Sequence, residues 1–343
     1  ARRRLTGAQA GLLAATAAGC VAFAVVDPKL GSAVGIAAFL LLNTLHLGLR
    51  MAAWWIGVSP VLQPTLRRDD AALPSYTLIV PLFEEAHMIA PLCSALAALD
   101  YPHDRLEAIL AVEAGDFPTR RAIETTALPA WVKVVVVPPG DIQTKPRACN
   151  HALAEASGEF VVVYDAEDRP EPDQLRKAVA AFDAGGDRLV CLQARLVPYN
   201  VRDNSLTRLF TLDYCQWFDG MLTGFERLGL PVPLGGTSNH FRTAVLRNSG
   251  GWDSWNVTED ADLGIRLWRL GLGVGTIEST TFEEAPRRLG VWINQRTRWA
   301  RGYLQTFLVH SRRPRTLGLP RLGLAGWFFL ASFVGGSTLF ALV

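Results

Sequence analysis

The sequence is poor in cysteine and in net charge, and both shortages exclude classes of protein. Its 343 residues include five cysteines, and no two of them stand at the Cys-x-x-Cys spacing of zinc and redox sites. An odd number of cysteines, scattered along the chain, is typical of reduced packing residues in a reducing compartment. The 34 lysines and arginines nearly balance the 32 aspartates and glutamates, which leaves a formal charge of +2. A chain so balanced gives no reason to expect nucleic acid as a partner.

Familiar phosphate-binding and nucleophile motifs are also missing. The chain has neither a Walker-type phosphate loop nor a Gly-x-Gly-x-x-Gly at a strand–helix junction, and it has no Gly-x-Ser-x-Gly nucleophile elbow. Any chemistry therefore depends on other residues.

Charge is absent from three long apolar stretches, residues 6–26, 31–49 and 322–343. Each approaches the roughly 20 residues that cross a hydrocarbon core of about 30 Å. We therefore expect transmembrane helices at about 6–26, 31–58 and 319–343, with the chain continuing beyond the third. The first stretch resembles a signal peptide, but a second span follows almost at once, so we expect a retained hairpin.

Basic residues flank these stretches on one side of the expected membrane. They are Arg2–Arg4, Arg67, Arg68, Arg312, Arg313, Arg315 and Arg321, whereas the turn 27–29 carries no excess of positive charge. The positive-inside rule then predicts that the N-terminus and the segment from about residue 67 to 321 are cytoplasmic.

Strand-like and helix-like runs alternate between the second and third spans. The expected strands are 76–81, 106–113, 131–137 and 160–164, and the expected helices are 86–99, 118–126, 146–156 and 172–182. Strands rich in Val, Ile and Leu that alternate with helices predict an α/β fold with a mostly parallel sheet. The ligand of such a sheet lies beyond the carboxyl ends of its strands.

Acidic residues follow three of these strands. They are Glu84 and Glu85, then Glu113, then the cluster Asp165, Glu167 and Asp168. Carboxylates at this edge suit Mg²⁺ or Mn²⁺, which combine one or two of them with phosphate oxygens. The structural alternative is that such residues cap the next helix or complement its dipole.

Thr258-Glu259-Asp260 opens a helical run, residues 261–270. Thr258 suits the N-cap and the two acids suit the first turn, so a structural role accounts for all three. The functional alternative makes Asp260 a general base, because a carboxylate near other carboxylates has the raised proton affinity that this role requires.

Two further segments combine polar, basic and aromatic residues. The segment 235–241 is a glycine turn that lets the backbone approach a ligand, although its His240 alone is more often structural. The amphipathic stretch 287–310 is typical of a helix at a membrane surface. Within it, Arg298 can hold a diphosphate and Trp299 can stack on a sugar. Lys145, Arg147 and Asn150 could add contacts to the donor.

The order of these motifs resembles family 2 glycosyltransferases of the processive kind, such as bacterial cellulose synthase catalytic subunits. The resemblance covers about residues 75–299 and the flanking spans, and Gln295-x-x-Arg298-Trp299 is its most specific element. The segments Tyr164–Asp168 and Gly235–Phe241 are similar to those of a bacterial subgroup that includes exopolysaccharide synthases and phage adsorption protein B.

The resemblance implies a type A nucleotide-diphospho-sugar transferase fold and an inverting, metal-dependent transfer. Carried onto this sequence, it makes Asp260 the base, with Glu259 and Thr258 beside it. It implies a donor site at Glu84, Glu113, Lys145, Asp165, Gln295 and Arg298, and acceptor contacts at Trp299, Gly236, Thr237, Asn239 and His240. The usual Asp-x-Asp reads Asp165-Ala166-Glu167 here, so either Glu167 or Asp168 is the second ligand of Mg²⁺ (or Mn²⁺).

These expectations give four regions: two transmembrane helices within 1–66, a cytoplasmic glycosyltransferase domain at 67–286, interface helices at 287–318, and a third span at 319–343. The implied protein polymerises a β-linked polysaccharide, a glucan, from a UDP-sugar and passes it across the bacterial inner membrane. Its implied partners are lipid, the growing polysaccharide and an accessory periplasmic or membrane subunit. Single-sugar transfer to a lipid, or a non-catalytic phage receptor with the same fold, are the alternatives.

Overall fold

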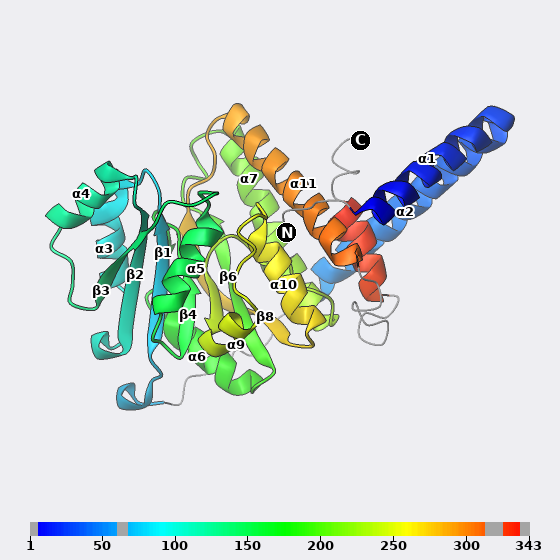
Figure 1. Cartoon of the computed structure of the whole chain (residues 1–343). Helices are drawn as coiled ribbons and strands as arrows, with labels where there is room; N and C mark the ends of the chain where they lie inside the picture. The colour runs from blue at the N-terminus through cyan, green and yellow to red at the C-terminus, as the bar shows by residue number, and fades with distance from the viewer. Residues whose placement is uncertain (1–5, 60–67, 313–324, 337–343) are drawn as a thin grey trace.

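The computed structural model describes residues 6–59, 68–312 and 325–336. It consists of a helical hairpin that projects from an α/β domain (Figure 1). The remaining residues include Arg2–Arg4, Arg67, Arg313, Arg315 and Arg321 and most of the third expected span, so these predictions lie outside the described residues.

The hairpin consists of α1 (Gly7–Val26) and α2 (Pro28–Gly57). A capping box between Thr6 and Gln9 begins α1, and the Asp27 side chain with Pro28 begins α2. Of the described helices, α2 alone is long and apolar enough to cross a bilayer by length and composition, whereas α1 and residues 325–335 form shorter apolar helices.

The domain is built on one eight-stranded sheet in the order β3-β2-β1-β4-β7-β6-β8-β5. Its strands are β1 (Tyr76–Leu82), β2 (Leu106–Glu113), β3 (Val132–Val137), β4 (Phe160–Val163), β5 (Arg169–Pro170), β6 (Leu189–Pro198), β7 (Asn239–Arg242) and β8 (Gly273–Glu283). The four predicted strands are confirmed, and β1 to β4 pair in parallel. In the other half β7 is antiparallel to both neighbours, whereas β6 and β8 are parallel.

Helices cover both faces of the sheet because its strands are apolar on both. Ile79 belongs to one buried cluster, while its neighbours Leu78 and Val80 belong to the cluster on the opposite face. The helices are α3 (Ile89–Ala97), α4 (Phe117–Thr125), α5 (Lys145–Glu155), α6 (Gln174–Gly185), α7 (Ser205–Cys215), α8 (Leu222–Arg227), α9 (Thr243–Asn248), α10 (Glu259–Arg269) and α11 (Leu289–Ser311), with short turns η1 (Asp70–Ala72), η2 (Ala86–Met88) and η3 (His103–Arg105).

Where the hairpin meets the domain, backbone atoms of α2 lie directly against backbone atoms of the domain. Two π-helical turns, η4 (Gln216–Met221) and η5 (Phe329–Gly335), and α8 pack around the end of α2. A Cβ atom at Gly57 would overlap the Gly220 carbonyl group, and one at Gly224 would overlap that of Ala53. Small residues therefore allow the backbone of α2 to lie directly against that of η4 and α8.

Gly224→Ala should loosen this contact. Its methyl group has no room, and overpacking of this kind costs roughly 1–3 kcal/mol. The midpoint of thermal unfolding of the detergent-solubilised chain should fall. Gly48→Ala is the control, because nothing lies within 4 Å of its Cβ position on α2. Equal midpoints for the two variants would contradict the backbone contact.

Candidate active site

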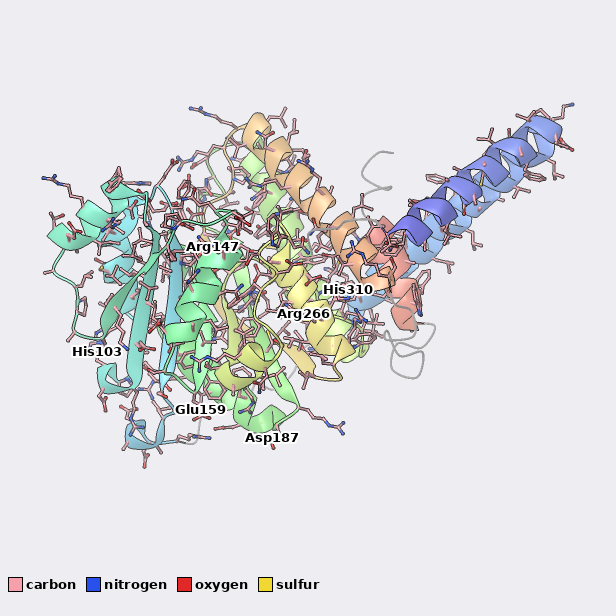
Figure 2. The ribbon with its side chains drawn as sticks, in the orientation of Figure 1. His103, Arg147, Glu159, Asp187, Arg266 and His310 are labelled. Atoms are coloured by element: carbon pink, nitrogen blue, oxygen red, sulfur yellow. The ribbon has the colours of Figure 1, made fainter. Side chains whose placement is uncertain are left out.

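A cavity of about 410 Å³ lies beyond the carboxyl ends of β1, β2 and β4. Its wall combines the end of β1, the start of α5 and the turn after β4, with Glu113, Lys145, Asp165 and Glu167 among the lining residues. Figure 2 shows Arg147 at this end of the domain, with Glu159 and Asp187 at the other. The edge predicted from the parallel strands is thus the edge where these groups meet.

Glu85 rather than Glu84 lines this cavity. Glu84 has a positive φ of 59°, and its backbone N–H donates to Asp116 Oδ2 at 2.6 Å. This left-handed turn directs the chain so that the next side chain reaches the wall. We therefore replace Glu84 with Glu85 in the predicted donor site.

The Lys145 ammonium lies between two oxygens of the site. It is 2.5 Å from Asp165 Oδ1 and donates to the Gly236 carbonyl oxygen at 2.5 Å. Burial by itself would lower the pKa of Lys145, but Asp165, Asp260 and Glu259 outweigh burial and raise that pKa. Lys145 therefore stays charged even though it is the first residue of α5, where the helix dipole disfavours a cation.

Glu167 and Asp168 have different surroundings. Asp168 is buried, and its Oδ2 accepts hydrogen bonds from the Asp165 N–H at 2.7 Å and from the Thr237 hydroxyl. Glu167 is exposed on the cavity wall, where partial burial and then the charges of Asp165 and Glu85 raise its pKa to about 7. Asp168 therefore shapes the turn, and Glu167 faces the same cavity as Asp165.

The described residues contain no group of three or more His, Cys, Asp and Glu side chains that could hold a metal ion by themselves. Asp165 and Glu167 nevertheless fit Mg²⁺ or Mn²⁺, because such ions are often held by one or two carboxylates plus the phosphates of a substrate. This arrangement favours Glu167 over Asp168 as the second ligand.

The Asp260 carboxylate and the Lys145 ammonium both lie near Gly236. A Cβ atom built on Gly236 would meet only Asp260 Oδ2 and Lys145 Nζ, each at 4.0 Å, so the space between them is open. Burial and then the charge of Glu259 raise the pKa of Asp260 well above its ordinary value, against the effects of Lys145 and Trp252. The carboxylate thus has the high proton affinity expected of a general base.

Thr258 lies at the N-cap of α10, but its side chain makes no capping hydrogen bond to that helix. Its N–H and hydroxyl instead donate to Asn256 Oδ1, at 3.2 Å and 3.4 Å. Thr258 therefore occupies the predicted N-cap position without a side-chain capping hydrogen bond, and its side chain belongs to the loop that approaches α11.

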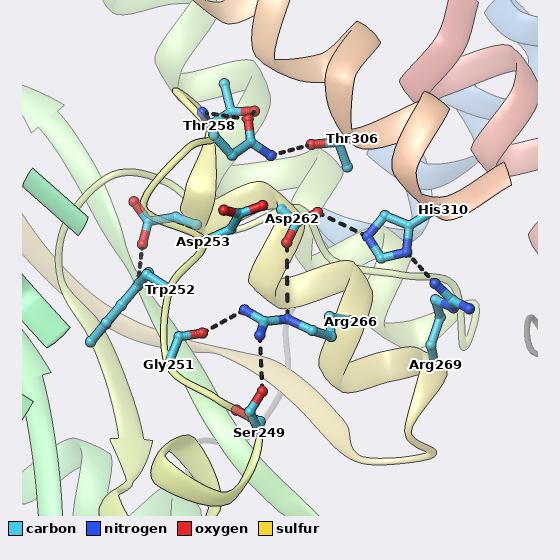
Figure 3. A network of polar contacts seen from close by, with 12 residues as sticks. Ser249, Gly251, Trp252, Asp253, Thr258, Asp262, Arg266, Arg269, Thr306 and His310 are labelled. Carbon is cyan, nitrogen blue, oxygen red and sulfur yellow. Dashed lines mark hydrogen bonds and ion pairs between the residues drawn. The ribbon is translucent and has the colours of Figure 1, made fainter. Parts of the chain in front are cut away.

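α11 packs on α10 and on the loop before it (Figure 3). Asn256 donates to Thr306 Oγ1 at 2.8 Å, and a Cβ atom at Gly302 would overlap Thr258. Arg269 donates to His310 Nδ1 at 2.6 Å, so the Nε2–H of His310 donates to Asp262 at 3.0 Å. These contacts fix the second half of α11 against α10 and the loop before it.

Within the segment Gln295–Trp299 of α11, Arg298 is exposed, whereas Gln295 and Trp299 are half-buried. Arg298 is one helical turn before Gly302, so it shares the face of α11 that meets Thr258. The Trp299 ring lies 4.6 Å from the guanidinium of Arg296, which also pairs with Asp213 at 2.5 Å. Arg296 is a structural clamp that the sequence did not single out.

The buried polar residues after Gly236 do not reach the open space. His240 lies 2.7 Å from the Tyr76 hydroxyl and 3.3 Å from Gln174 Oε1, and burial lowers its pKa to about 3. Asn239 donates to the Gly235 carbonyl oxygen, and Thr237 donates to Asp168. We therefore drop Thr237, Asn239 and His240 as direct acceptor ligands and keep Gly236.

Sequence reasoning also missed Glu283, at the end of β8. Burial and then the charge of Asp165 raise the pKa of Glu283 to about 8, which indicates a position close to the acidic cluster. Because Glu283 is an acid at the end of a strand, the rule that found Glu113 would have found it, had β8 been predicted.

Comparisons with known proteins agree with this geometry. A protein-family model described as "Glycosyl transferase family group 2" matches residues 160–343. The "Probable glycosyltransferase YdaM" of Bacillus subtilis (strain 168) is 29% identical over 70% of this chain and 57% of its own length. A "Beta-monoglucosyldiacylglycerol synthase" of Synechocystis sp. (strain ATCC 27184 / PCC 6803 / Kazusa) is 29% identical over 74% of this chain and 53% of its own length. The chain thus spans little more than half of these relatives.

One solved structure shares the fold. The "Mannosyltransferase PcManGT from Pyrobaculum calidifontis in complex with GDP-Man and Mn2+" superposes with a TM-score of 0.62 at 22% identity, over 88% of this chain and 84% of that one. The expected fold of type A nucleotide-sugar transferases is confirmed.

Lys145→Met should destabilise the chain more at pH 8 than at pH 5. Lys145 lowers the pKa values of Asp260 and Glu259, which burial raises. Groups with a raised pKa stabilise the folded state at low pH and lose that contribution as pH rises. Without Lys145, the folded state loses more of this stabilisation between pH 5 and pH 8. We expect an extra loss of roughly 1 kcal/mol, a small value because Asp165 and Lys145 are partly exposed.

Thermal unfolding at the two pH values measures this difference. Lys145 itself stays protonated throughout this range, so the carboxyl groups alone carry the pH dependence. Lys177→Met, which removes partly exposed ion pairs with Glu171 and Asp173, is the control and should show no such difference. A pH-independent deficit in Lys145→Met would contradict the assignment.

Proposed function

The chain belongs to glycosyl transferase family group 2, and on that premise we propose that it moves one hexose from a nucleotide-diphospho-sugar to a lipid hydroxyl at a membrane surface, with inversion at the sugar carbon. The observation that carries this proposal is the open space at Gly236, which is bordered by both the Asp260 carboxylate and the cation Lys145. A base and a cation for the diphosphate beside one open space suit an inverting displacement.

The donor site would begin at Glu113. Its Oε2 lies 3.4 Å from Arg147, whereas its buried Oε1 has no hydrogen-bond partner among the described residues. A free carboxylate oxygen beside a guanidinium suits the N–H and C=O groups on the edge of a nucleobase. Phe83 is half exposed on the same cavity wall and offers a stacking surface.

The diphosphate would lie against Lys145, with Arg298 and Gln295 closing over it from α11. Asp165 and Glu167 would hold a divalent cation, Mg²⁺ or Mn²⁺, which supplies positive charge to the departing diphosphate. The mannosyltransferase with the same fold was solved with Mn²⁺ and GDP-Man, which supports this assignment.

Asp260 would take the proton of the acceptor hydroxyl as its oxygen bonds to the sugar carbon. The bond from that carbon to the diphosphate breaks at the same time, and the leaving group stays on Lys145. Trp299 would border the acceptor.

A lipid acceptor is supported by the outer surface of α7 and α11. Leu209, Leu212 and Ile293 are exposed there, Leu212 by 67%, and Gln9 at the start of α1 donates to the Leu308 carbonyl oxygen of α11 at 2.8 Å. Exposed apolar side chains on two helices that run toward the hairpin suit an interfacial surface, and two of the relatives are named for a lipid product. We propose that the hairpin spans a bacterial inner membrane, with the domain on its cytoplasmic side.

Polysaccharide synthesis is the second candidate, because Gln295-x-x-Arg298-Trp299 resembles the processive enzymes. The non-catalytic receptor has no comparable support, since the family and its relatives are named as transferases.

Asp260→Asn should lower kcat by at least about 100-fold, because the amide cannot accept the acceptor proton. Nucleotide release from UDP-sugars, measured with diacylglycerol in mixed micelles, reports turnover, and the mass of the lipid product reports the number of hexoses. Binding of UDP should persist. Asp219→Asn, on an exposed carboxylate 3.8 Å from Arg195, is the control.

If Asp260→Asn turns over within threefold of the wild-type rate, Asp260 is not the base. A ladder of many hexoses in place of a single addition would instead favour the second candidate.

A further inference from the structure

Trp252 donates a hydrogen bond to the carboxylate that the proposed reaction uses as base. Its indole N–H lies 2.9 Å from Asp260 Oδ1, and both side chains are buried. Burial makes this contact consequential, because a carboxylate removed from water retains its charge only when neighbours stabilise it.

The backbone around Trp252 is fixed from two sides. Asn150 of α5 donates to the Trp252 carbonyl oxygen at 2.8 Å and accepts from the Trp252 N–H at 3.0 Å. Arg266 of α10 donates to the Gly251 carbonyl oxygen at 2.5 Å (Figure 3). Gly251 has a φ of +62°, and a side chain there would overlap Asn150.

The indole ring is fixed as well. It packs edge-on against Phe241 of β7, with ring centroids 5.8 Å apart. Because backbone and ring are both held, the N–H is directed at one oxygen of Asp260, and the other oxygen is left beside the open space at Gly236.

We propose that Trp252 is a positioning residue for sugar transfer: its indole N–H holds Asp260 Oδ1 so that Oδ2 faces the acceptor hydroxyl as an ionised base. This inference rests on the proposed role of Asp260. It gives Asn150 a role as well, since Asn150 orients Trp252 and is not among the residues that line the donor cavity.

The charges around Asp260 predict how a loss of this hydrogen bond appears in a pH profile. Glu259 on α10 and Asp165 after β4 raise the pKa of Asp260, Lys145 on α5 lowers it, and the thiols of Cys149 and Cys191 are nearby. The Trp252 hydrogen bond also lowers that pKa. Its removal therefore raises the pKa and moves the acidic limb of activity to higher pH.

Trp252→Phe keeps the ring against Phe241 and removes the donor. We expect kcat to fall roughly 10- to 100-fold, as for the loss of a hydrogen bond to a charged group, with the KM for the nucleotide-sugar unchanged. The acidic limb of kcat against pH should shift upward. Trp268→Phe is a matched control, because Trp268 also donates its indole N–H, at 3.0 Å, but to the Gly229 carbonyl oxygen.

A double-variant comparison separates positioning from general damage. In an Asp260→Asn background, Trp252→Phe should lower residual turnover less than threefold, since both changes act through one group. If Trp252→Phe unfolds, a tryptophan isostere with sulfur in place of the N–H at position 252 keeps the volume and tests the same hydrogen bond.

Unchanged kcat and pH profile in a folded Trp252 variant would overturn this inference while Asp260→Asn remained inactive. An active Asp260→Asn would instead overturn the proposed base, so the two failures are distinguishable. Full additivity of the two substitutions would also contradict positioning through Asp260.

Discussion

The Lys145 ammonium lies 2.5 Å from Asp165 Oδ1 and 2.5 Å from the Gly236 carbonyl oxygen, among the carboxyl groups of Asp260 and Glu259. Carboxylates brought together in a partly buried site repel one another and lose hydration, so a cation has to stay among them. α5 supplies it and also carries Arg147, which faces Glu113, and Asn150, which holds Trp252. One helix thus links the three regions that we propose for the nucleotide, the diphosphate and the base.

The second constraint is the contact between α10 and α11. Thr306 and His310 tie α11 to Asn256 and Asp262, on either side of Asp260 in the sequence. The exposed Arg298 belongs to this helix, whose last turns also contact the start of α1 through Gln9. The apolar hairpin, the basic helix α11 and the proposed base therefore follow one another in space, which is the order in which the proposed lipid acceptor would meet them.

The parallel half of the sheet could be predicted because β1, β2 and β4 are predominantly apolar, and Glu113, Asp165 and Glu167 line the cavity at the edge that this prediction indicates. The other half could not, since β7 has four residues and its antiparallel partners are distant in sequence. The choice between Glu167 and Asp168 depends on a hydroxyl at Thr237, and Glu85 replaces Glu84 because of one left-handed residue. Such long-range contacts and backbone reversals have no local signature.

Binding of Mn²⁺ to the full chain, followed by electron paramagnetic resonance with and without UDP, tests the central role of Lys145 most directly. Lys145 and the proposed metal would compete for Asp165, so Lys145→Gln should bind Mn²⁺ more tightly than wild type in the absence of nucleotide. With UDP present the order should reverse, because the variant has lost its cation for the diphosphate. Weaker binding by the variant under both conditions, or no change under either, would contradict the account.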